Sequence, residues 1–181
     1  MKIGIIKERK NPPDNRVPLS PSVCASIINQ GIEVVVEPSD SRCFKNKEYE
    51  MAGVPMTTDL SDCNILMGVK EVPIDNLVSG KTYFFFSHTI KEQSYNRKLL
   101  QSILKKDINL IDYEVLTDAS GKRVIAFGRF AGMVGAHNGV WTYAQRTKKF
   151  ELPRMKDLSG YKEAKKVYSA LDFPPMKIVL T

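Results

Sequence analysis

Cysteine and histidine are scarce in this sequence, with three cysteines and two histidines among 181 residues. Cys24, Cys43 and Cys63 form no C-x-x-C pair, and an odd number of cysteines cannot pair completely. His88 and His137 are not spaced to share a metal ion with them. These absences exclude a disulfide framework and a zinc site, so we expect reduced thiols and no metal.

Long apolar runs are also missing. No stretch reaches the roughly 18 residues that a membrane helix needs. The apolar run near the amino terminus, residues 3–6, is too short for a secretory signal. We therefore expect no membrane partner and a cytoplasmic protein.

The charge is basic but unevenly placed. Lys and Arg outnumber Asp and Glu by 27 to 20, which gives a formal charge of +7. Residues 142–181 hold nine basic and four acidic side chains, a net +5. Neither aromatic residues interleaved with the basic ones nor a helix-turn-helix pattern accompanies this segment. It is typical of a solvated face, so nucleic acid is not an expected partner.

Short apolar runs alternate with amphipathic segments over residues 1–127, and 43% hydrophobic residues suffice for a core. Strands are predicted at residues 3–6, 33–37, 54–56, 65–69, 82–86, 110–116 and 123–127, the last two joined through 118–121. Helices are predicted at 21–31, 46–52 and 93–106. Strands alternating with helices favour an α/β fold with a doubly wound, mostly parallel, Rossmann-like sheet.

Glycines mark the segment that follows. Gly128, Gly132, Gly135 and Gly139 fall at i, i+4, i+7 and i+11, so they share one face of a predicted helix. Such a face suits close approach by a neighbouring domain or subunit, and a homo-oligomer is among the partners it admits. The spacing is not G-x-G-x-x-G, so it predicts no phosphate cradle.

Three divisions of the chain follow from these patterns. We expect a substrate-binding domain at residues 1–140 and a linker with a polar helix at 141–175. Residues 176–181 have the composition of a strand with nothing after it, which suggests the first strand of a missing nucleotide-binding domain.

Charged side chains follow the predicted strands: Arg16, Lys70 with Glu71, His88 and Glu114. The carboxyl ends of parallel strands meet at one edge of a sheet, where such folds bind ligands. An arginine there can clamp a carboxylate, while a lysine and a histidine can exchange protons. Taken singly, each has a plainer interpretation: a solvated arginine, a strand-end charge pair or a core histidine. Together they favour proton transfer on a small carboxylate substrate.

Two sets of motifs carry a family resemblance. The first comprises K-I-G-I at 2–5, K-E at 7–8 and N-R-V at 15–17. It resembles the N-terminal domain of alanine dehydrogenases and pyridine-nucleotide transhydrogenases. The second comprises G-V-K-E-V-P at 68–73, F-F-S-H-T-I-K-E-Q at 85–93, L-I-D-Y-E at 110–114 and R-V-I-A-F-G at 123–128. It resembles the saccharopine dehydrogenases and the lysine-ketoglutarate reductase half of aminoadipic semialdehyde synthase.

This resemblance, over about residues 1–140, implies a pyridine-nucleotide oxidoreductase of lysine metabolism that joins lysine and 2-oxoglutarate through saccharopine. By its motifs Lys70 is the general base and His88 the general acid, and Glu71 and Glu114 adjust their charge. It also implies substrate-binding roles for Arg16, Lys91, Gln93 and Arg123. Lys122 falls where a relative has a cofactor-contacting arginine, and lysine cannot make the same bidentate contact.

The resemblance implies NAD or NADP as cofactor, bound by a downstream Rossmann domain that carries the glycine fingerprint. Because this sequence lacks that fingerprint, we expect the chain alone to bind no dinucleotide and to be inactive. Two alternatives stay open: an alanine dehydrogenase-like domain, and a non-catalytic remnant that uses its glycine-faced helix for assembly. The polar residues 91–93 suit a long charged substrate better than pyruvate.

Overall fold

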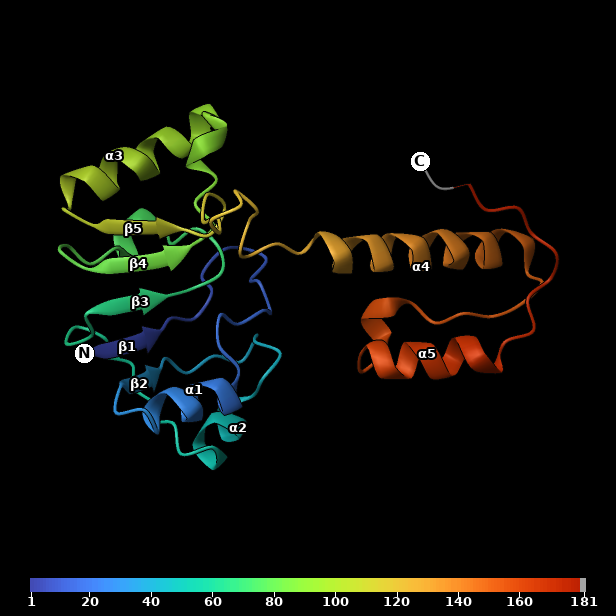
Figure 1. The fold of residues 1–181 in the computed structure, drawn as a ribbon, viewed down its shortest axis with the longest axis horizontal. Helices are drawn as coiled ribbons and strands as arrows, with labels where there is room; N and C mark the ends of the chain where they lie inside the picture. The colour runs from blue at the N-terminus through green and yellow to red at the C-terminus, as the bar shows by residue number, and fades with distance from the viewer. Residues whose placement is uncertain (180–181) are drawn as a thin grey trace. The chain divides into compact units, whose positions relative to one another are not determined.

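The computed structural model describes residues 1–179, and the chain divides into two compact units, Met1–Ile125 and Ala126–Thr181. The first unit is built on a sheet of five parallel strands in the order β2-β1-β3-β4-β5 (Figure 1). The strands are β1 (Lys2–Ile5), β2 (Glu33–Val36), β3 (Ile65–Met67), β4 (Thr82–Phe85) and β5 (Asn109–Asp112). The strand order reverses between β1 and β3, which makes that gap the topological switch point.

Helices connect the strands as the sequence predicts. Ser20 caps α1 by accepting a hydrogen bond from the Val23 N–H at 3.4 Å, and Pro21 occupies the first turn. The α-helices of the unit are α1 (Pro21–Ile28), α2 (Asn46–Met51) and α3 (Arg97–Lys105). Single 3₁₀ turns lie at η1 (Ile74–Asn76), η2 (Thr89–Lys91) and η3 (Ser94–Asn96).

The sheet buries a hydrophobic cluster on each face, because successive strand residues point to opposite sides. One cluster joins Ile5 and Val36 of the sheet to Cys24 of α1 and Tyr49 of α2. The other contains the sheet and helix residues Val35, Leu66, Tyr83, Phe85, Leu99 and Ile103. The helices α1 and α2 therefore cover one face and α3 the other, so the predicted doubly wound α/β fold is confirmed.

Three of the predicted strands are wrong in extent. The strand predicted at 110–116 ends at Asp112, because the chain turns there and the Val115 N–H donates to the Asp112 carbonyl. Residues 123–127 form no strand, and only Thr117 and Arg123 make an antiparallel bridge. The Asp118 carboxylate accepts hydrogen bonds from the Ser120 and Lys122 N–H groups, which closes a tight turn, and the pairing beyond it ends once the Val124 N–H has donated to the Leu116 carbonyl. The strand predicted at 54–56 is likewise reduced to one bridge, between Val36 and Met56.

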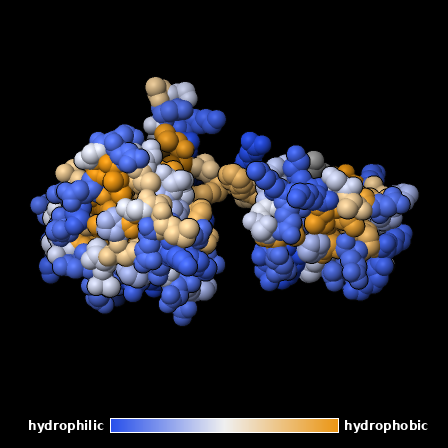
Figure 2. Space-filling view, turned by 90° about the horizontal axis from the view of Figure 1, so that it is seen from below, coloured by the Kyte–Doolittle hydropathy of each residue, from blue (hydrophilic) through white to orange (hydrophobic). Residues whose placement is uncertain are grey.

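The second unit contains α4 (Gly128–Thr147), η4 (Met155–Asp157) and α5 (Tyr161–Ala170). His137 of α4 is buried, with Nε2 2.8 Å from the Pro153 carbonyl oxygen and Nδ1 3.1 Å from the Tyr168 hydroxyl. Figure 2 shows hydrophilic side chains over much of each unit's visible surface, with apolar residues in patches between them.

The glycine-faced helix is formed, and residue 140, where we expected a domain boundary, lies inside it. A methyl group placed on Gly128, Gly132, Gly135 or Gly139 would meet no heavy atom within 4 Å in the described part of the chain. The strand expected at 176–181 is not formed over residues 176–179, where no neighbouring strand offers a ladder. Its last two residues lie outside the described ones.

Candidate active site

The carboxyl edge of the sheet gathers the charged side chains that follow its strands. The segment after β1 supplies Glu8, Lys10 and Arg16, and the one after β3 supplies Lys70 and Glu71. His88 follows β4, and Glu114 follows β5. Four strands thus contribute to one edge, as expected for a ligand site of an open α/β sheet.

His88 stands at the centre of a row of alternating charges. Its Nδ1 lies 2.9 Å from Glu114 Oε2, and the other oxygen of Glu114 lies 3.1 Å from Lys91 Nζ. Its Nε2 lies 3.9 Å from Glu71 Oε1, and Glu71 Oε2 accepts a hydrogen bond from Lys10 Nζ at 3.0 Å. The side chains of His88, Glu71 and Glu114 are 18%, 11% and 14% exposed, so the centre of the row is largely shielded from water, while Lys10 and Lys91 at its ends are about half exposed.

The pKa of Glu114 is lowered. Burial opposes this shift, but hydrogen bonds from His88 and Lys91 outweigh it. An ionised carboxylate can only accept, so His88 Nδ1 donates to Glu114 and Lys91 donates to the other oxygen. Lys91 Nζ also lies 3.2 Å from His88 Nδ1, but an ammonium cannot donate to a nitrogen that already carries a proton, and the shorter 2.9 Å contact with Glu114 decides the assignment. In the neutral imidazole the proton then resides on Nδ1, which leaves the Nε2 lone pair for a reacting group.

The backbone holds His88 in place. Its φ of 56° lies in the left-handed region, which is uncommon for a residue with a side chain. The buried Asn96 side chain donates to the His88 carbonyl at 3.2 Å, and the Lys91 N–H donates to it at 3.1 Å. The imidazole lies nearly parallel to the Phe86 ring, with centroids 6.3 Å apart. A strained backbone held by such contacts is typical of a functional position.

A second carboxylate, Glu8, bridges the switch point between β1 and β3. Its two oxygens accept hydrogen bonds from the Val69 N–H at 2.7 Å and the Lys70 N–H at 3.0 Å. Burial raises the pKa of Glu8, although these two hydrogen bonds oppose the shift. Glu8 therefore fixes the backbone of Lys70, and its surroundings differ from those of Glu114.

Arg16 and Asp14 form a paired group on the loop after β1. The Arg16 Nε and Nη2 atoms lie 2.9 and 2.6 Å from the two Asp14 oxygens. The hydrogen bonds from Arg16 lower the pKa of Asp14, and the nearby Lys70 charge lowers it further. The Lys70 ammonium itself makes no hydrogen bond or ion pair with any residue in the described part of the chain.

Three residues singled out from the sequence are not part of the charge row centred on His88. The Gln93 side-chain oxygen accepts a hydrogen bond from the Tyr95 hydroxyl at 2.6 Å, on the exposed surface. Arg123 and Lys122 are exposed at the turn held by Asp118. Their predicted roles toward substrate and cofactor stay predictions.

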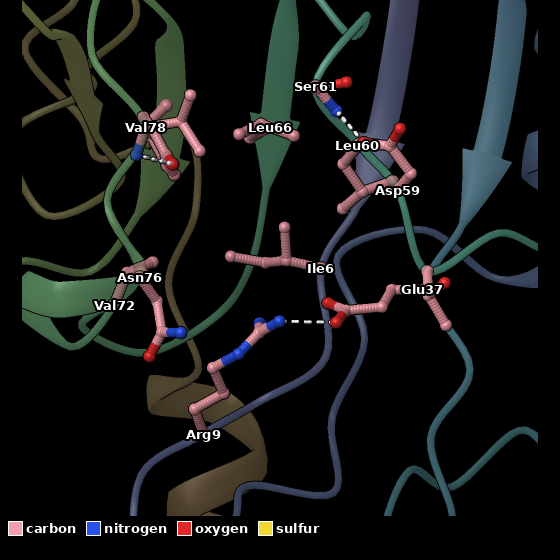
Figure 3. Close-up of a pocket in the computed structure, with 12 residues that line it drawn as sticks. Ile6, Arg9, Glu37, Asp59, Leu60, Ser61, Leu66, Val72, Asn76 and Val78 are labelled. Atoms are coloured by element: carbon pink, nitrogen blue, oxygen red, sulfur yellow. Dashed lines mark hydrogen bonds and ion pairs between the residues drawn. The ribbon is translucent and has the colours of Figure 1, made fainter.

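A separate small cavity of about 190 Å³ lies on the face of the sheet beside Ile6 and Leu66. Figure 3 shows Arg9 and Glu37 joined by an ion pair at one side of it, with Asn76 and Val78 across from Glu37. None of the site residues predicted from the sequence lines this cavity.

The sequence predicts neither a metal site nor a membrane-spanning helix. No group of three or more His, Cys, Asp or Glu side chains able to hold a metal ion occurs among residues 1–179. None of the helices in that part of the chain is long and apolar enough to cross a membrane.

Sequence reasoning missed several residues of the edge: Glu8, Lys10, Asp14, Ser87 and Asp112. Glu8 follows β1 as Lys70 follows β3, so the same strand-end signal could have found it. Asp112 gives no such signal, because it is the last residue of β5 within an unbroken predicted strand. Its burial and its contacts are visible only in three dimensions.

Comparison with known proteins gives a consistent result. The model of the family "Alanine dehydrogenase/PNT, N-terminal domain" matches residues 4–134. Alpha-aminoadipic semialdehyde synthase, mitochondrial, of Bos taurus is 45% identical over 136 residues, 75% of this chain and 15% of that protein. Saccharopine dehydrogenase [NAD(+), L-lysine-forming] of Emericella nidulans is 37% identical over 150 residues, 79% of this chain and 40% of that protein.

Solved structures agree on the fold. An L-alanine dehydrogenase superposes with a TM-score of 0.57 at 23% identity, covering 67% of this chain and 35% of that one. The transhydrogenase of Sinorhizobium meliloti superposes with a TM-score of 0.55 at 19% identity, over 66% and 37% of the two chains. The chain thus spans well under half the length of these relatives.

Proposed function

Because the chain belongs to the alanine dehydrogenase/PNT N-terminal domain family, we propose that its carboxyl edge is the substrate half of a saccharopine-type dehydrogenase. The reaction is the reversible reductive amination that joins lysine to 2-oxoglutarate. The relatives at 45% and 37% identity support this choice over an alanine dehydrogenase, since the alanine dehydrogenase structure is only 23% identical.

The observation that carries the proposal is the charge row centred on His88. Saccharopine has several carboxylates and a secondary amine, so its site needs cations and groups that exchange protons. The carboxyl edge of the sheet offers the cations Arg16 and Lys91, and the Lys91 side chain is about half exposed. Arginine is suited to a bidentate carboxylate contact, and positioned cations orient a substrate for reaction.

Lys70 and His88 carry the proposed proton transfers. Cleavage of saccharopine requires water to add to an imine carbon and protons to move at nitrogen and oxygen. Lys70 acts as base through its neutral amine, which forms no hydrogen bond or ion pair with the described residues, and His88 exchanges its proton at Nε2. Glu114 fixes the imidazole from the Nδ1 side, and Glu71 balances the charge on the Nε2 side.

The described residues do not fit a dinucleotide. No glycine-rich turn leads from a strand to a helix N-terminus in residues 1–179, and β1 is followed by a proline-containing segment, residues 6–20. We therefore place the NAD(P) site, which supplies the hydride acceptor, outside these residues, in a downstream Rossmann domain. The cytoplasmic location stays a prediction, and the name of the bovine relative assigns that protein to mitochondria.

Binding can be tested on this chain, because it contains only two histidines. Saccharopine is titrated while the imidazole resonances of His88 and His137 are followed by NMR. The proposal predicts a saturable shift at His88 and none at the buried His137 of the second unit. A shift with pyruvate or alanine instead would indicate an alanine dehydrogenase-like domain. No shift with any of them would contradict the proposed function.

Catalysis is tested with the dinucleotide-binding domain of a relative joined to the chain. We expect Lys70→Met with His88→Gln to abolish saccharopine turnover. The exposed Lys105→Met at the end of α3 is the matched control and should keep it. Wild-type turnover in the double variant would overturn the assignment.

A further inference from the structure

One buried carboxylate lies between the two segments that carry His88 and Glu114. Asp112 ends β5, and it pairs in register with Phe85 at the end of β4. Asp112 is 8% exposed, and Ser87, the residue before His88, is fully buried. The site described above does not use either side chain.

The Asp112 carboxylate accepts three hydrogen bonds. Its Oδ1 accepts from the Ser87 N–H at 3.3 Å and from the Glu114 N–H at 2.9 Å. Its Oδ2 accepts from the Ser87 hydroxyl, since an ionised carboxylate has no proton to give. The Ser87 oxygen in turn accepts from the Thr89 hydroxyl at 2.7 Å and the Thr89 N–H at 3.1 Å.

These contacts join two separate strand ends. One side chain binds the residue before His88 and the backbone of Glu114, and the partners it uses are neutral donors. A buried carboxylate is costly unless it is fully hydrogen-bonded, so such an arrangement holds its donors firmly in one geometry. The 2.9 Å contact between His88 Nδ1 and Glu114 Oε2 depends on how these two backbones are placed.

We propose that Asp112, through its bonds to Ser87 and Glu114, is the positioning residue that sets the His88–Glu114 contact and thereby the imidazole tautomer. This inference rests on the proposed function in one respect only, namely that the Nε2 atom of this tautomer exchanges a proton with the substrate. Glu114, Glu71 and Lys91 are the charged groups that face the ring.

The imidazole tautomer can be read from long-range ¹H–¹⁵N spectra at a pH where both histidines are neutral. His88 should carry its proton on Nδ1, because that atom faces the Glu114 carboxylate. His137 should carry its proton on Nε2, because that atom faces the Pro153 carbonyl. The two histidines thus have opposite expected signatures, and His137 is an internal control.

Asp112→Ala should abolish the Nδ1–H signature of His88 and leave that of His137 unchanged. Ser87→Ala and Asp112→Asn, which remove part of the network, should weaken it. Asp118→Ala is the matched control, because Asp118 accepts a similar set of bonds from the Ser120 N–H, the Ser120 hydroxyl and the Lys122 N–H. It should leave both histidines as they are.

An unchanged His88 tautomer in folded Asp112→Ala would overturn the proposal. Should that variant fail to fold, as judged by loss of the dispersed amide resonances of residues 1–125, the two milder variants decide. An unchanged tautomer in both of them would overturn it equally. No substrate or cofactor is present in these spectra, so failure of saccharopine to bind would contradict the proposed function and leave this inference standing.

Discussion

Gly68 lies between β3 and Lys70, and replacing it with alanine perturbs the Glu8 bridge directly. A β-carbon at this position would lie 2.9 Å from Ile6 Cδ1, 3.0 Å from Ile6 Cγ1 and 3.3 Å from Glu8 Oε1. Gly68 is not among the residues with a positive φ, so its backbone can accept alanine and the cost is steric. Ile6 must shift within a buried cluster, and the carboxylate oxygen that binds the Val69 N–H must give way.

The size of the effect follows from two opposing contributions. Overfilling a packed core costs about 1–3 kcal/mol. Replacing glycine by alanine in a compatible conformation stabilises by about 0.4–1 kcal/mol through the unfolded chain. We therefore expect Gly68→Ala to lower the free energy of unfolding of the first unit by roughly 1.3 kcal/mol, the difference between the mid-range values of about 2 and about 0.7 kcal/mol.

Urea unfolding followed by tyrosine and far-ultraviolet circular dichroism measures this change, while the single tryptophan, Trp141, reports separately on the second unit. Gly4→Ala is the matched control, since its β-carbon would meet Cys63 and Leu66 at 2.9 Å and does not touch Glu8. Both variants should be destabilised, but only Gly68→Ala should speed amide hydrogen exchange at Val69 and Lys70. Unchanged stability in Gly68→Ala, or equal exchange in the two variants, would refute the reasoning.

Three further outcomes are expected. Glu114→Gln should be less stable than the wild type at pH 6 by up to about 1 kcal/mol. Because the pKa of Glu114 is lowered in the folded state, this stability difference should shrink as the pH falls below 4.5 and through that lowered pKa. Denaturation at several pH values will test this. Calorimetric titration with NAD or NADP should show no binding at micromolar concentration, and tight binding would contradict the proposal that the dinucleotide site lies outside the described residues. Gly135→Ala should raise the free energy of unfolding of the second unit by about 0.5–1 kcal/mol, since the added methyl group meets open space on a helix. Unfolding followed by Trp141 fluorescence measures this change, and a loss of stability would mean that this face is covered.

Much of the fold could be predicted because its signals are local. The run Glu33–Val36 is β-branched after its first residue, and Ser20 with Pro21 marks the start of α1 in the sequence itself. Parallel strands then place their carboxyl ends on one edge, so the sequence predicts that Lys70, His88 and Glu114 lie at the same edge of the sheet. Strand composition failed at residues 123–127, where the pairing after the turn at Asp118 stops at one bridge and α4 begins at Gly128.

The candidate site was predicted less completely, because its supporting contacts are not local. Lys10 and Glu71 are separated by 61 residues, and Ser87 and Asp112 by 25. Neither pairing has a sequence spacing that distinguishes it from chance. Asp14 sits two residues from Arg16, yet both would look the same in a solvated loop. These pairings depend on which loops the folded sheet places side by side.

Environment, more than residue type, distinguishes the two glutamates of this edge. Glu8 accepts hydrogen bonds from backbone N–H groups in a half-buried position, and burial raises its pKa. Glu114 also loses some water, but His88 and Lys91 more than compensate, and its pKa is lowered. Pairs of titratable groups whose surroundings shift them in opposite directions mark the division between acid and base roles. Glu114 is therefore the fixed negative charge that orients His88, while Glu8 holds the Lys70 backbone and is the more readily protonated of the two. Without Lys91, Glu114 would lose one of the two side-chain hydrogen bonds that lower its pKa, and burial would then shift that pKa upward, as it does for Glu8.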